Sequence, residues 1–473
     1  MTATYAAVDL GAASGRVIVG QLQPDRVRLT EVHRFRNEPL DLPDGLHWDI
    51  AALYREVLAG LGAAAEHAPA SVGIDSWAVD YGLLDESGAL LGLPFHYRDR
   101  RTAGTAAGAD DFYSLAGIAP LPFNTINQLR ADDPERLAAA RTMLMIPDLL
   151  TFWLTGVRGS ERTNASTTQL YDATARTWSD EIIAAAKLPR GIFAELHDPG
   201  HRIGPVRPAV TAATGLNSTV VAVGSHDTAS AVAAVPATGD DFAYISCGTW
   251  SLVGVELAGP VLTEAARAAM FTNEAGLDGT IRFLRNVMGL WLLQQCQESW
   301  PGADLAELLA SAADQKAFVS LVNPDDPRFL PPGDMPGRID AYCRETGQPV
   351  PGSPAAYVRC ILESLALAHR AAVRTAEALS GRPVRQIHVV GGGARNRLLC
   401  QLTADAANLP VSAGPVEATA LGNILAQARA DGGPDDLAAM RALVAGSEPV
   451  RMYEPDPTAA ARWDTAAARI GLV

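Results

Sequence analysis

The residues best suited to chemistry in this chain lie together in the sequence SHDT at 225–228. The continuous apolar run 219–224 before them predicts a buried strand, and the small residues after them predict a helix. A carboxylate that opens a helix is stabilised by the helix N-terminus and can accept a proton from a hydroxyl group as a general base. An Asp at this position more often caps the helix, although Ser225 or Thr228 could supply the cap. The residues alone therefore leave both roles of Asp227 open.

A second set of polar side chains lies in GIDSWAVDYGLLD, residues 73–85, which contains Asp75, Trp77 and Asp80. The alternating pattern predicts a strand. Carboxylates beside an aromatic ring can hold a sugar, because the carboxylates accept hydrogen bonds from hydroxyl groups and the ring packs against C–H groups. Trp77 is equally suited to fill a hydrophobic core, so the segment is a candidate sugar-binding strand.

Two similar hairpins, about half a chain apart, are typical of sites that bind phosphate. Tyr5–Gly20 has Asp9 at the end of its first strand and a turn of small residues, and Tyr244–Val255 turns through SCGT. Such turns expose backbone N–H groups to phosphate oxygens. Ser14 and Arg16 can donate to the same anion, and Asp9 can reach a phosphate-bound Mg²⁺ through water. Alone, the first could be an ordinary hairpin; the second favours a pair of phosphate-binding turns.

A third element, QIHVVGGGARN at 386–396, places three glycines between a buried strand and a helix. The glycines let the backbone approach a nucleoside or a phosphate closely. The dinucleotide fingerprint is excluded, because Asn396 stands where its last glycine is required. The two lysines, Lys187 and Lys316, follow no glycine-rich loop, so the phosphate loop G-x-x-x-x-G-K-[ST] is absent.

These elements, in this order, resemble the actin-like ATPase superfamily and, within it, the FGGY-type carbohydrate kinases. The similar segments extend from residue 7 to residue 423 and include GIDSWAVDYGLLD (73–85), LPFNTINQL (121–129), SHDTASAV (225–232), SCGTWSL (246–252), NVMGLWLLQ (286–294), VVGGGARN (389–396) and GPVEATALGN (414–423). The resemblance implies an α/β fold of two actin-like (ribonuclease H-like) domains with ATP in the cleft between them. Because PATGDD at 236–241 breaks the pattern, we expect a sugar-binding domain over 1–237 and a nucleotide-binding domain over 238–473.

The resemblance also implies roles for single residues. Asp227 is the expected catalytic base, which favours catalysis over capping. The expected substrate contacts are Ala78, His226, Asp227, Thr228 and Asn286. The expected ATP contacts are Ala12, Ala13, Ser14, Gly15, Arg16, Thr249, Gln294 and Gly392. Asp9 is expected to reach Mg²⁺ through water.

Three of these positions depart from the family's pattern. Ala78 replaces a glycine, and Ala13 and Cys247 each replace a serine. The contacts at these positions use mainly the backbone, so they can survive the changes. Asn286 and Gln294, eight residues apart, are expected on a similar face of one helical segment.

The reaction implied by the resemblance is transfer of phosphate from ATP, with Mg²⁺, to O1 of L-rhamnulose. A kinase for another ketose, such as L-fuculose or xylulose, is the first alternative. An actin-like ATPase without sugar kinase activity is the second, since fold does not fix function. The SHDT segment favours a kinase, because an ATPase of that kind needs no base for a sugar hydroxyl.

The composition of the chain argues against several classes of binding partner. At 473 residues the chain is long enough for two domains, and its net charge of −15 argues against nucleic acid and anionic membranes. The five cysteines are scattered without C-x-x-C pairs, which argues against zinc and a disulfide framework. Neither a signal peptide nor an apolar run of membrane-spanning length is evident, which predicts a cytoplasmic protein acting on small molecules as a monomer or homodimer.

The elements that must position these residues follow from hydrophobic periodicity and from turn residues. Strands are predicted at 5–10, 16–22, 27–35, 71–75, 79–84 and 219–224. Helices are predicted at 47–66, 228–235, 289–299, 303–316, 353–379, 395–407, 418–431 and 458–470. Ser353 is the expected cap of the helix at 353–379, and Gly381 is expected just past its end.

Overall fold

The computed structural model describes residues 3–104 and 112–472. The chain forms two compact units. Unit 1 comprises Met1–Ala234, Leu257–Phe283 and Ala418–Ser447, and unit 2 comprises Val235–Glu256, Leu284–Glu417 and Glu448–Val473. Each unit combines separate segments of the chain. The domain boundary that the sequence analysis expects at 237/238 stays a prediction. Within the described residues, no helix is long and apolar enough to cross a membrane.

Unit 1 is built on a six-stranded sheet in the order β13-β14-β6-β1-β2-β3. Its strands are β1 (Ala3–Leu10), β2 (Ser14–Leu22), β3 (Val27–Arg36), β4 (Pro39–Leu42), β5 (Gly45–Trp48), β6 (Ser71–Ser76), β7 (Tyr81–Leu84), β8 (Thr142–Met145), β9 (Ser160–Glu161), β10 (Tyr171–Asp172), β11 (Thr177–Trp178), β12 (Leu196–His197), β13 (Arg202–Pro205), β14 (Thr219–Val221) and β17 (Thr272–Ala275). Its helices are α1 (Ile50–Ala65), α2 (Tyr113–Ala116), α3 (Thr125–Arg130), α4 (Pro134–Ala139), α5 (Ile146–Thr155), α6 (Arg162–Ala165), α7 (Asp180–Ala185), α8 (Pro208–Thr214), α9 (Asp227–Ala233), α10 (Glu264–Ala268), α16 (Ala418–Ala430) and α17 (Leu437–Ser447).

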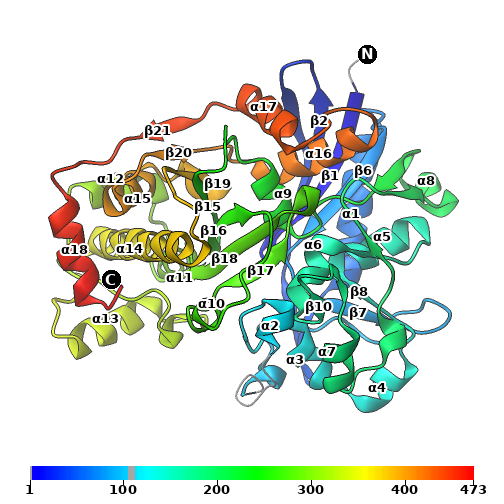
Figure 1. Ribbon diagram of the computed structural model, residues 1–473, viewed down its shortest axis with the longest axis horizontal. Helices are drawn as coiled ribbons and strands as arrows, with labels where there is room; N and C mark the ends of the chain where they lie inside the picture. Colours follow the sequence, from blue (N-terminus) through cyan, green and yellow to red (C-terminus); the bar gives the residue numbers. More distant parts are fainter. Residues whose placement is uncertain (1–2, 105–111, 473) are drawn as a thin grey trace. The chain divides into compact units, whose positions relative to one another are not determined.

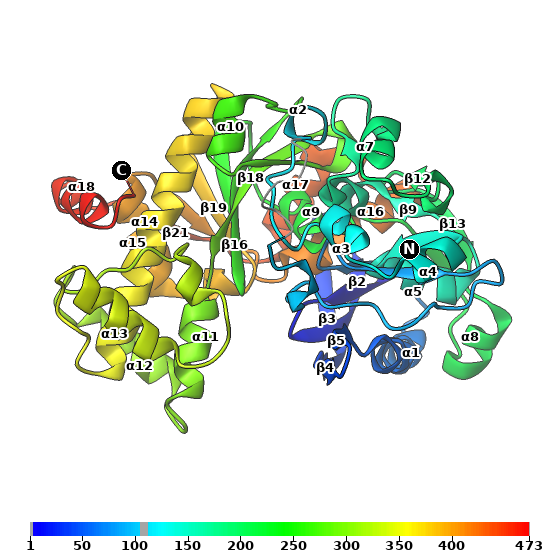
Figure 2. The same cartoon turned by 90° about the horizontal axis from the view of Figure 1, so that it is seen from below.

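The centre of the unit 1 sheet is the parallel pair β1 and β6, whose continuous apolar sequences suit strands buried on both faces. Helix α16 packs against β1 and β6, and α1 packs against β2 and β3 (Figures 1 and 2). Two glycines permit the close approach of α16: a Cβ at Gly20 would lie 2.4 Å from the Ile424 side chain, and a Cβ at Gly73 would lie 2.4 Å from Asn423 Oδ1. The end of β1, and Asp9 with it, is therefore fixed on several sides.

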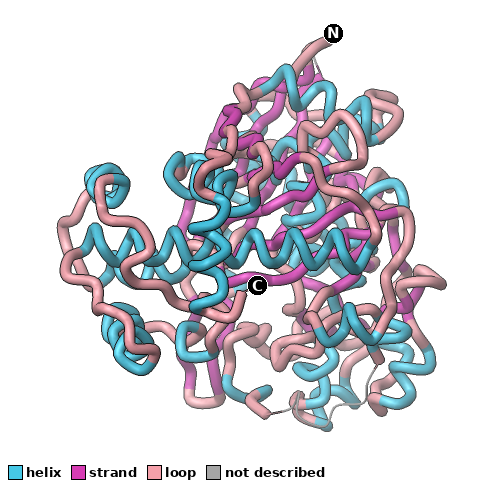
Figure 3. The backbone as a smooth tube through the Cα atoms, turned by 60° about the vertical axis from the view of Figure 1, so that its left-hand side comes forward, coloured by secondary structure: helices cyan, strands magenta, loops and turns pink. Residues whose placement is uncertain are grey.

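In unit 2 the strands follow the order β18-β16-β15-β19-β20-β21, with β15 and β16 antiparallel and β19 parallel to β15. Its elements are β15 (Phe242–Cys247), β16 (Trp250–Leu257), β18 (Ile281–Met288), β19 (Gln386–Val390), β20 (Val411–Ala413), β21 (Arg451–Tyr453), α11 (Trp291–Glu298), α12 (Leu305–Ala313), α13 (Met335–Glu345), α14 (Pro354–Ser380), α15 (Arg397–Ala407) and α18 (Ala460–Arg469). Figure 3 shows both helices and strands through the chain, as in a protein that combines α and β structure.

The long helix α14 has the ends that its sequence predicts. Ser353 accepts a hydrogen bond from Ala356 N, Pro354 occupies the first turn, and Gly381 ends the helix in the left-handed conformation at φ +68°. Other elements are shorter than predicted. The strand expected at 219–224 ends at Val221, and the helix expected at 47–66 begins at Ile50 because Asp49 caps it.

Candidate active site

Asp227 is the first residue of α9, and its side chain is 31% exposed. Among the residues that the structure describes, no side chain caps this helix. Ser225 Oγ instead donates to Glu161, and Thr228 Oγ1 donates to Asp227 Oδ1 at 3.0 Å. Burial raises the pKa of Asp227 above its ordinary value, His226 opposes the shift, and Asp9 adds to it. The result is an accessible carboxylate with increased basicity that does not serve as the helix cap.

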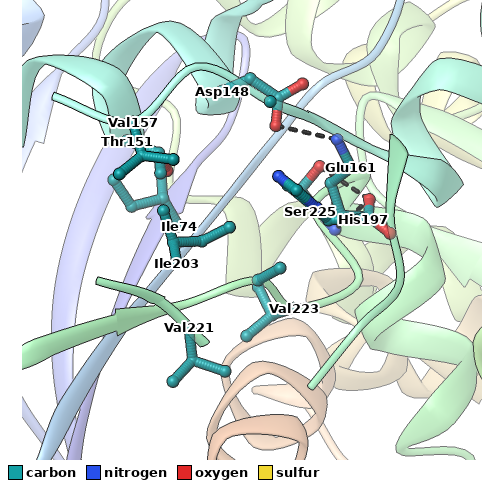
Figure 4. Close-up of a pocket in the computed structure, with 12 residues that line it drawn as sticks. Ile74, Asp148, Thr151, Val157, Glu161, His197, Ile203, Val221, Val223 and Ser225 are labelled. Carbon is teal, nitrogen blue, oxygen red and sulfur yellow. Dashed lines mark hydrogen bonds between the residues drawn. The ribbon is translucent and has the colours of Figure 1, made fainter. Parts of the chain in front are cut away.

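Glu161 fixes the backbone just before Asp227. Its buried carboxylate accepts hydrogen bonds from Ser225 N (3.0 Å) and Ser225 Oγ (2.8 Å), and also from the first residues of α6. Figure 4 shows Glu161 linked to Ser225 and to Asp148, whose Oδ1 accepts a hydrogen bond from Glu161 N at 3.1 Å. Sequence analysis missed Glu161, because the local sequence has no pattern that marks a contact with residue 225.

A cavity of about 20 Å³ lies beside this carboxylate, with Asp148, Glu161 and His197 among its polar lining (Figure 4). The volume suits a single water molecule. Burial, and then the charge of Glu161, raises the pKa of Asp148 well above its ordinary value, and burial also raises the pKa of Glu161. The backbone just before Asp227 is thus held by the buried polar side chain of Glu161, which in turn lies next to Asp148.

His226 is buried between charged side chains of unit 1. Its Nδ1 lies 3.1 Å from Glu274 Oε2 and 3.2 Å from Nη2 of Arg282, and its Nε2 lies 3.5 Å from Asp227 Oδ1. Burial raises the pKa of Glu274, but the charge of Arg282 opposes this effect, and the net shift is downward. The sequence does not mark Glu274 and Arg282 as site residues, because no local pattern distinguishes them from other charged residues. Together they hold the imidazole next to the candidate base.

Two further carboxylates lie near Asp227. Asp9, at the end of β1, is paired in register with Asp75 on β6, and it forms an ion pair with Arg16 on β2. Asp75 is fully buried, and its Oδ2 accepts a hydrogen bond from Asn423 Nδ2 at 2.5 Å. Burial, followed by the charge of Asp9, raises the pKa of Asp75 well above its ordinary value. Among the described residues, no group of three His, Cys, Asp or Glu side chains is arranged to hold a metal directly.

The candidate sugar-binding strand differs from its prediction. The strand β6 ends at Ser76, and β7 begins only at Tyr81, because Val79 between them has φ +68°. Trp77 is buried with its ring centroid 4.0 Å from that of Trp48, so it fills the core. Ala78 is partly exposed in this connection.

Asp80 organises that core. Its Oδ2 accepts hydrogen bonds from Trp48 Nε1 (2.7 Å) and Trp77 Nε1 (3.0 Å), and its Oδ1 accepts one from Gln128 Nε2 (2.8 Å). Burial raises the pKa of Asp80 to about 6, although these hydrogen bonds oppose the shift. Protein donors already engage both oxygens, which indicates a structural role.

The first predicted phosphate turn joins β1 to β2, as expected. Gly11 N donates to Ser14 O at 2.9 Å, and Asn37 N, just past the end of β3, donates to Ala13 O at 3.1 Å, so the segment after β3 supports the turn. A Cβ at Gly15 would lie 2.2 Å from the Phe35 ring, so Gly15 must lack a side chain. Ala12 and Ala13 stand at the partly exposed tip of the turn.

In unit 2, the second turn brings two predicted ATP contacts together: Thr249 Oγ1 and Gln294 Oε1 are hydrogen-bonded at 3.3 Å. The expectation that Asn286 and Gln294 share one helical segment is wrong, because Asn286 lies on β18 and Gln294 on α11. Gly289 separates the two elements, and a Cβ there would lie 2.5 Å from the backbone of Trp250. The chain must therefore turn at Gly289 against the hairpin.

The three glycines at 391–393 follow β19. Gly391 has φ +80°, and a Cβ at Gly393 would lie 2.2 Å from Cys247 Sγ, whereas nothing lies within 4 Å of such an atom at Gly392. Gly392 therefore faces open space, as a residue that contacts a nucleotide must. Cys247 is buried against Gly393, and burial raises the pKa of its thiol to about 11. This thiol acts as a packing group.

The predicted site residues thus gather within each unit. In unit 1 the carboxylates of Asp9, Asp75 and Asp227 are electrostatically coupled, and His226 and Thr228 adjoin Asp227. In unit 2 Thr249 and Gln294 are in contact. The first group offers a base and acidic side chains, and the second offers neutral hydrogen-bonding groups beside a glycine-rich turn.

Comparison with known families gives matches across both halves of the chain. Residues 4–234 match the N-terminal domain of the FGGY family of carbohydrate kinases, and residues 243–430 match its C-terminal domain. A rhamnulokinase of Bacteroides thetaiotaomicron is 44% identical over 478 residues, covering 98% of each chain. A rhamnulokinase of Enterococcus faecalis is 43% identical over 467 residues, covering 96% of this chain and 94% of the relative.

Solved structures show the same fold at low sequence identity. Ligand-bound xylulose kinase from Lactobacillus acidophilus has a TM-score of 0.82 at 16% identity, covering 98% of this chain and 96% of the other. Plasmodium falciparum glycerol kinase with ADP has a TM-score of 0.77 at 15% identity, covering 99% and 97%. The predicted α/β fold of two domains is confirmed.

Proposed function

The chain belongs to the FGGY family of carbohydrate kinases, and we propose that it transfers the γ-phosphate of ATP to O1 of L-rhamnulose, giving L-rhamnulose 1-phosphate and ADP. Membership of a carbohydrate kinase family implies use of ATP. The observation that carries the choice of sugar is the 44% identity to a rhamnulokinase across 98% of both chains. The proposal is therefore an ATP-dependent ketose kinase with L-rhamnulose as its best substrate.

Asp227 is the proposed general base. It takes the proton from the attacking hydroxyl as the bond between that oxygen and phosphorus forms and the bond to the leaving ADP oxygen breaks. Its partial exposure gives a substrate access, and its raised pKa makes it a better proton acceptor than an ordinary carboxylate. Glu161 supports this role, because its hydrogen bonds to Ser225 hold the base-bearing backbone in place.

The proposed nucleotide contacts divide between side chains and backbone. Thr249 and Gln294 are adjacent polar side chains, and Gly392 leaves room for a flat group. The turn Ala12–Gly15, followed by Arg16, is proposed to bind phosphate through its amides. Such donors stabilise negative charge on a transferring phosphoryl group, which supplies much of the catalysis in reactions of this kind.

Mg²⁺ fits the acidic group of unit 1 if it is held through water. Asp75 Oδ1 is a buried acceptor without a hydrogen-bonding partner among the described residues, and Asp9 is its neighbour across the paired strands. Mg²⁺ usually keeps several waters and takes only one or two carboxylates, with phosphate oxygens as further ligands. When bound, the ion would neutralise phosphate charge, and Asp9 is the proposed residue that orients its water shell.

His226, Thr228, Ala78 and Asn286 are the proposed sugar contacts. His226 and Thr228 flank the base on either side, so a hydroxyl that reaches Asp227 also passes these two polar groups. Ala78 is proposed to act through its backbone, and Asn286 through its amide. These assignments rest on the family pattern and on the placement of His226 and Thr228.

A panel of ketoses, with glycerol added as a polyol, assayed by ADP release tests the proposal. L-rhamnulose should give the highest kcat/KM, ahead of L-fuculose, xylulose and glycerol. A higher kcat/KM for xylulose would be consistent with a sugar kinase but would contradict L-rhamnulose as the best substrate. ADP release that does not depend on any added ketose would support the remaining alternative, an actin-like ATPase without sugar kinase activity.

A further inference from the structure

Two charged side chains lie close to the same ring nitrogen of His226, Nδ1, and they favour opposite protonation states of that atom. Glu274 Oε2 lies 3.1 Å from Nδ1, whereas the guanidinium Nη1 and Nη2 of Arg282 lie 3.3 and 3.2 Å from the same atom. A carboxylate can only accept a hydrogen bond, so Glu274 favours a proton on Nδ1. A guanidinium can only donate, so Arg282 requires a lone pair there.

The hydrogen-bond angles of the two contacts indicate which protonation state of Nδ1 the structure favours. Both Arg282 contacts to Nδ1 have hydrogen-bond geometry. Glu274 Oε2, although close, accepts no hydrogen bond of acceptable angle from the described residues. The carboxylate lies 2.9 Å from Arg282 Nη1, so its charge is balanced by the guanidinium without a proton from the imidazole.

Arg282 is also held firmly in this orientation. It is completely buried, and its Nε donates to the backbone oxygen of Ala275 at 3.1 Å. Because a buried guanidinium needs acceptors for its N–H groups, rotation away from Nδ1 would leave donors without partners. The arginine is therefore a fixed donor.

We propose that Arg282 is a positioning residue that keeps Nδ1 of His226 unprotonated, so that His226 carries its single proton on Nε2 and acts as a hydrogen-bond donor in the site. The Nε2–H group is then a donor 3.5 Å from Asp227 Oδ1, available to a sugar oxygen that approaches the base. With the opposite tautomer, an N–H group on Nδ1 would face the N–H donors on both terminal nitrogens of Arg282. This role rests on the proposed kinase function, but the tautomer itself can be measured without turnover.

The direct test is a nitrogen NMR experiment on the full chain labelled with ¹⁵N-histidine. The protein has nine histidines, and the spectrum of His226→Gln identifies the signal that disappears. At pH 8 the signal should show an unprotonated Nδ1 and a protonated Nε2. An Nδ1–H tautomer, a doubly protonated ring or an averaged mixture overturns the proposal. If His226→Gln does not fold, replacing the other histidines one at a time identifies the signal by elimination.

Arg282→Lys tests the cause. The single ammonium cannot reproduce the two guanidinium contacts, so Nδ1 should gain proton occupancy from the influence of Glu274. The kcat/KM for L-rhamnulose should fall roughly 10- to 100-fold, as for partners that orient a functional histidine elsewhere. Arg370→Lys, a buried arginine of unit 2 that pairs with Asp464, is the matched control and should change neither readout.

An unchanged tautomer in folded Arg282→Lys would show that Arg282 does not set it. If instead the wild-type protein has the expected tautomer but phosphorylates no ketose, the proposed function fails and the assignment of Arg282 stands. The two failures are therefore distinguishable.

Discussion

Asp9 and Asp75 are paired residues on the parallel strands β1 and β6, and each carboxylate has its own polar partner. Asp9 is paired with Arg16 from β2, and Asp75 with Asn423 from α16. Burial, and then the charge of Asp9, raise the pKa of Asp75, and the hydrogen bond from Asn423 opposes that shift. Arg16 belongs to the neighbouring strand of the same sheet, and Asn423 belongs to a helix packed against that sheet, so the acidic group depends on the helix as much as on the strands.

Asn423→Ala should therefore destabilise unit 1. The change removes the donor to Asp75 Oδ2 and leaves a buried acceptor unsatisfied, at a cost of about 1–3 kcal/mol. Unfolding of the single variants Asn423→Ala and Asp75→Ala and of the double variant measures the coupling. Strictly additive effects would contradict a direct interaction between the two side chains.

Asp227→Asn should abolish sugar phosphorylation while ATP binding persists. The amide cannot accept the hydroxyl proton, so we expect a loss of at least about 10²-fold in kcat. Calorimetric titration with a non-hydrolysable ATP analogue provides the control for folding and binding. Near-normal turnover in this variant would exclude Asp227 as the base.

Glu161→Gln should lower kcat through the position of Asp227. In glutamine an NH2 group replaces one carboxylate oxygen, and it would face N–H and O–H groups that now donate to the carboxylate. The segment at Ser225 must therefore shift. Misplacement of a catalytic group costs roughly 10- to 100-fold in kcat, whereas the KM for ATP should remain within about two-fold. Glu363→Gln, a buried glutamate in α14 of unit 2 paired with Arg359, is the control. Equal losses in both variants would point to a general effect of removing buried charge.

The elements that sequence predicted well are those with strong local signals. Ser353 and Gly381 marked both ends of α14, and the small-residue turns of both hairpins lie where they were expected. The error at Asn286 arose because the eight-residue spacing to Gln294 fits one helix face as well as a strand followed by a helix. Gly289 was the available signal, since a glycine that must pass close to another backbone often ends an element.

The residues that sequence missed act over long separations in the chain. Glu161 contacts Ser225, 64 residues away, and Arg282 contacts His226, 56 residues away. A buried charged residue carries no periodicity of its own, so only the tertiary contacts identify its partner. Asp80 had the opposite problem: its residue type fitted a sugar contact, but the donors that surround it in the fold give it a structural role.

The buried carboxyl of Asp80 should make stability depend on pH. Its pKa of about 6 in the folded protein lies above the ordinary aspartate value of 3.8, so the folded state binds the proton more tightly than the unfolded state. The contribution of Asp80 to the free energy of unfolding is therefore largest below about pH 4 and falls by up to about 3 kcal/mol as the pH rises to about 6. The difference in stability between wild type and Asp80→Asn should change by this amount over that range. A difference that is independent of pH would contradict the shifted pKa.

Ala78→Gly should relax the choice of sugar without abolishing activity. L-rhamnulose is a 6-deoxy ketose, so its methyl group needs an apolar wall while its hydroxyl groups need polar partners such as His226 and Thr228. Fitting one methyl group contributes only about 1–3 kcal/mol, which limits discrimination against hydroxylated ketoses to about 10- to 200-fold. Ala78 is a partly exposed residue of the connection between β6 and β7, and removing its methyl group enlarges the space available to a bulkier substrate. The ratio of kcat/KM for L-rhamnulose to that for L-fructose, its analogue with a hydroxyl group on C6, should therefore fall in the variant, with kcat for L-rhamnulose nearly unchanged. A ratio that rises, or a loss of all activity, would place Ala78 outside the sugar site or make its side chain essential.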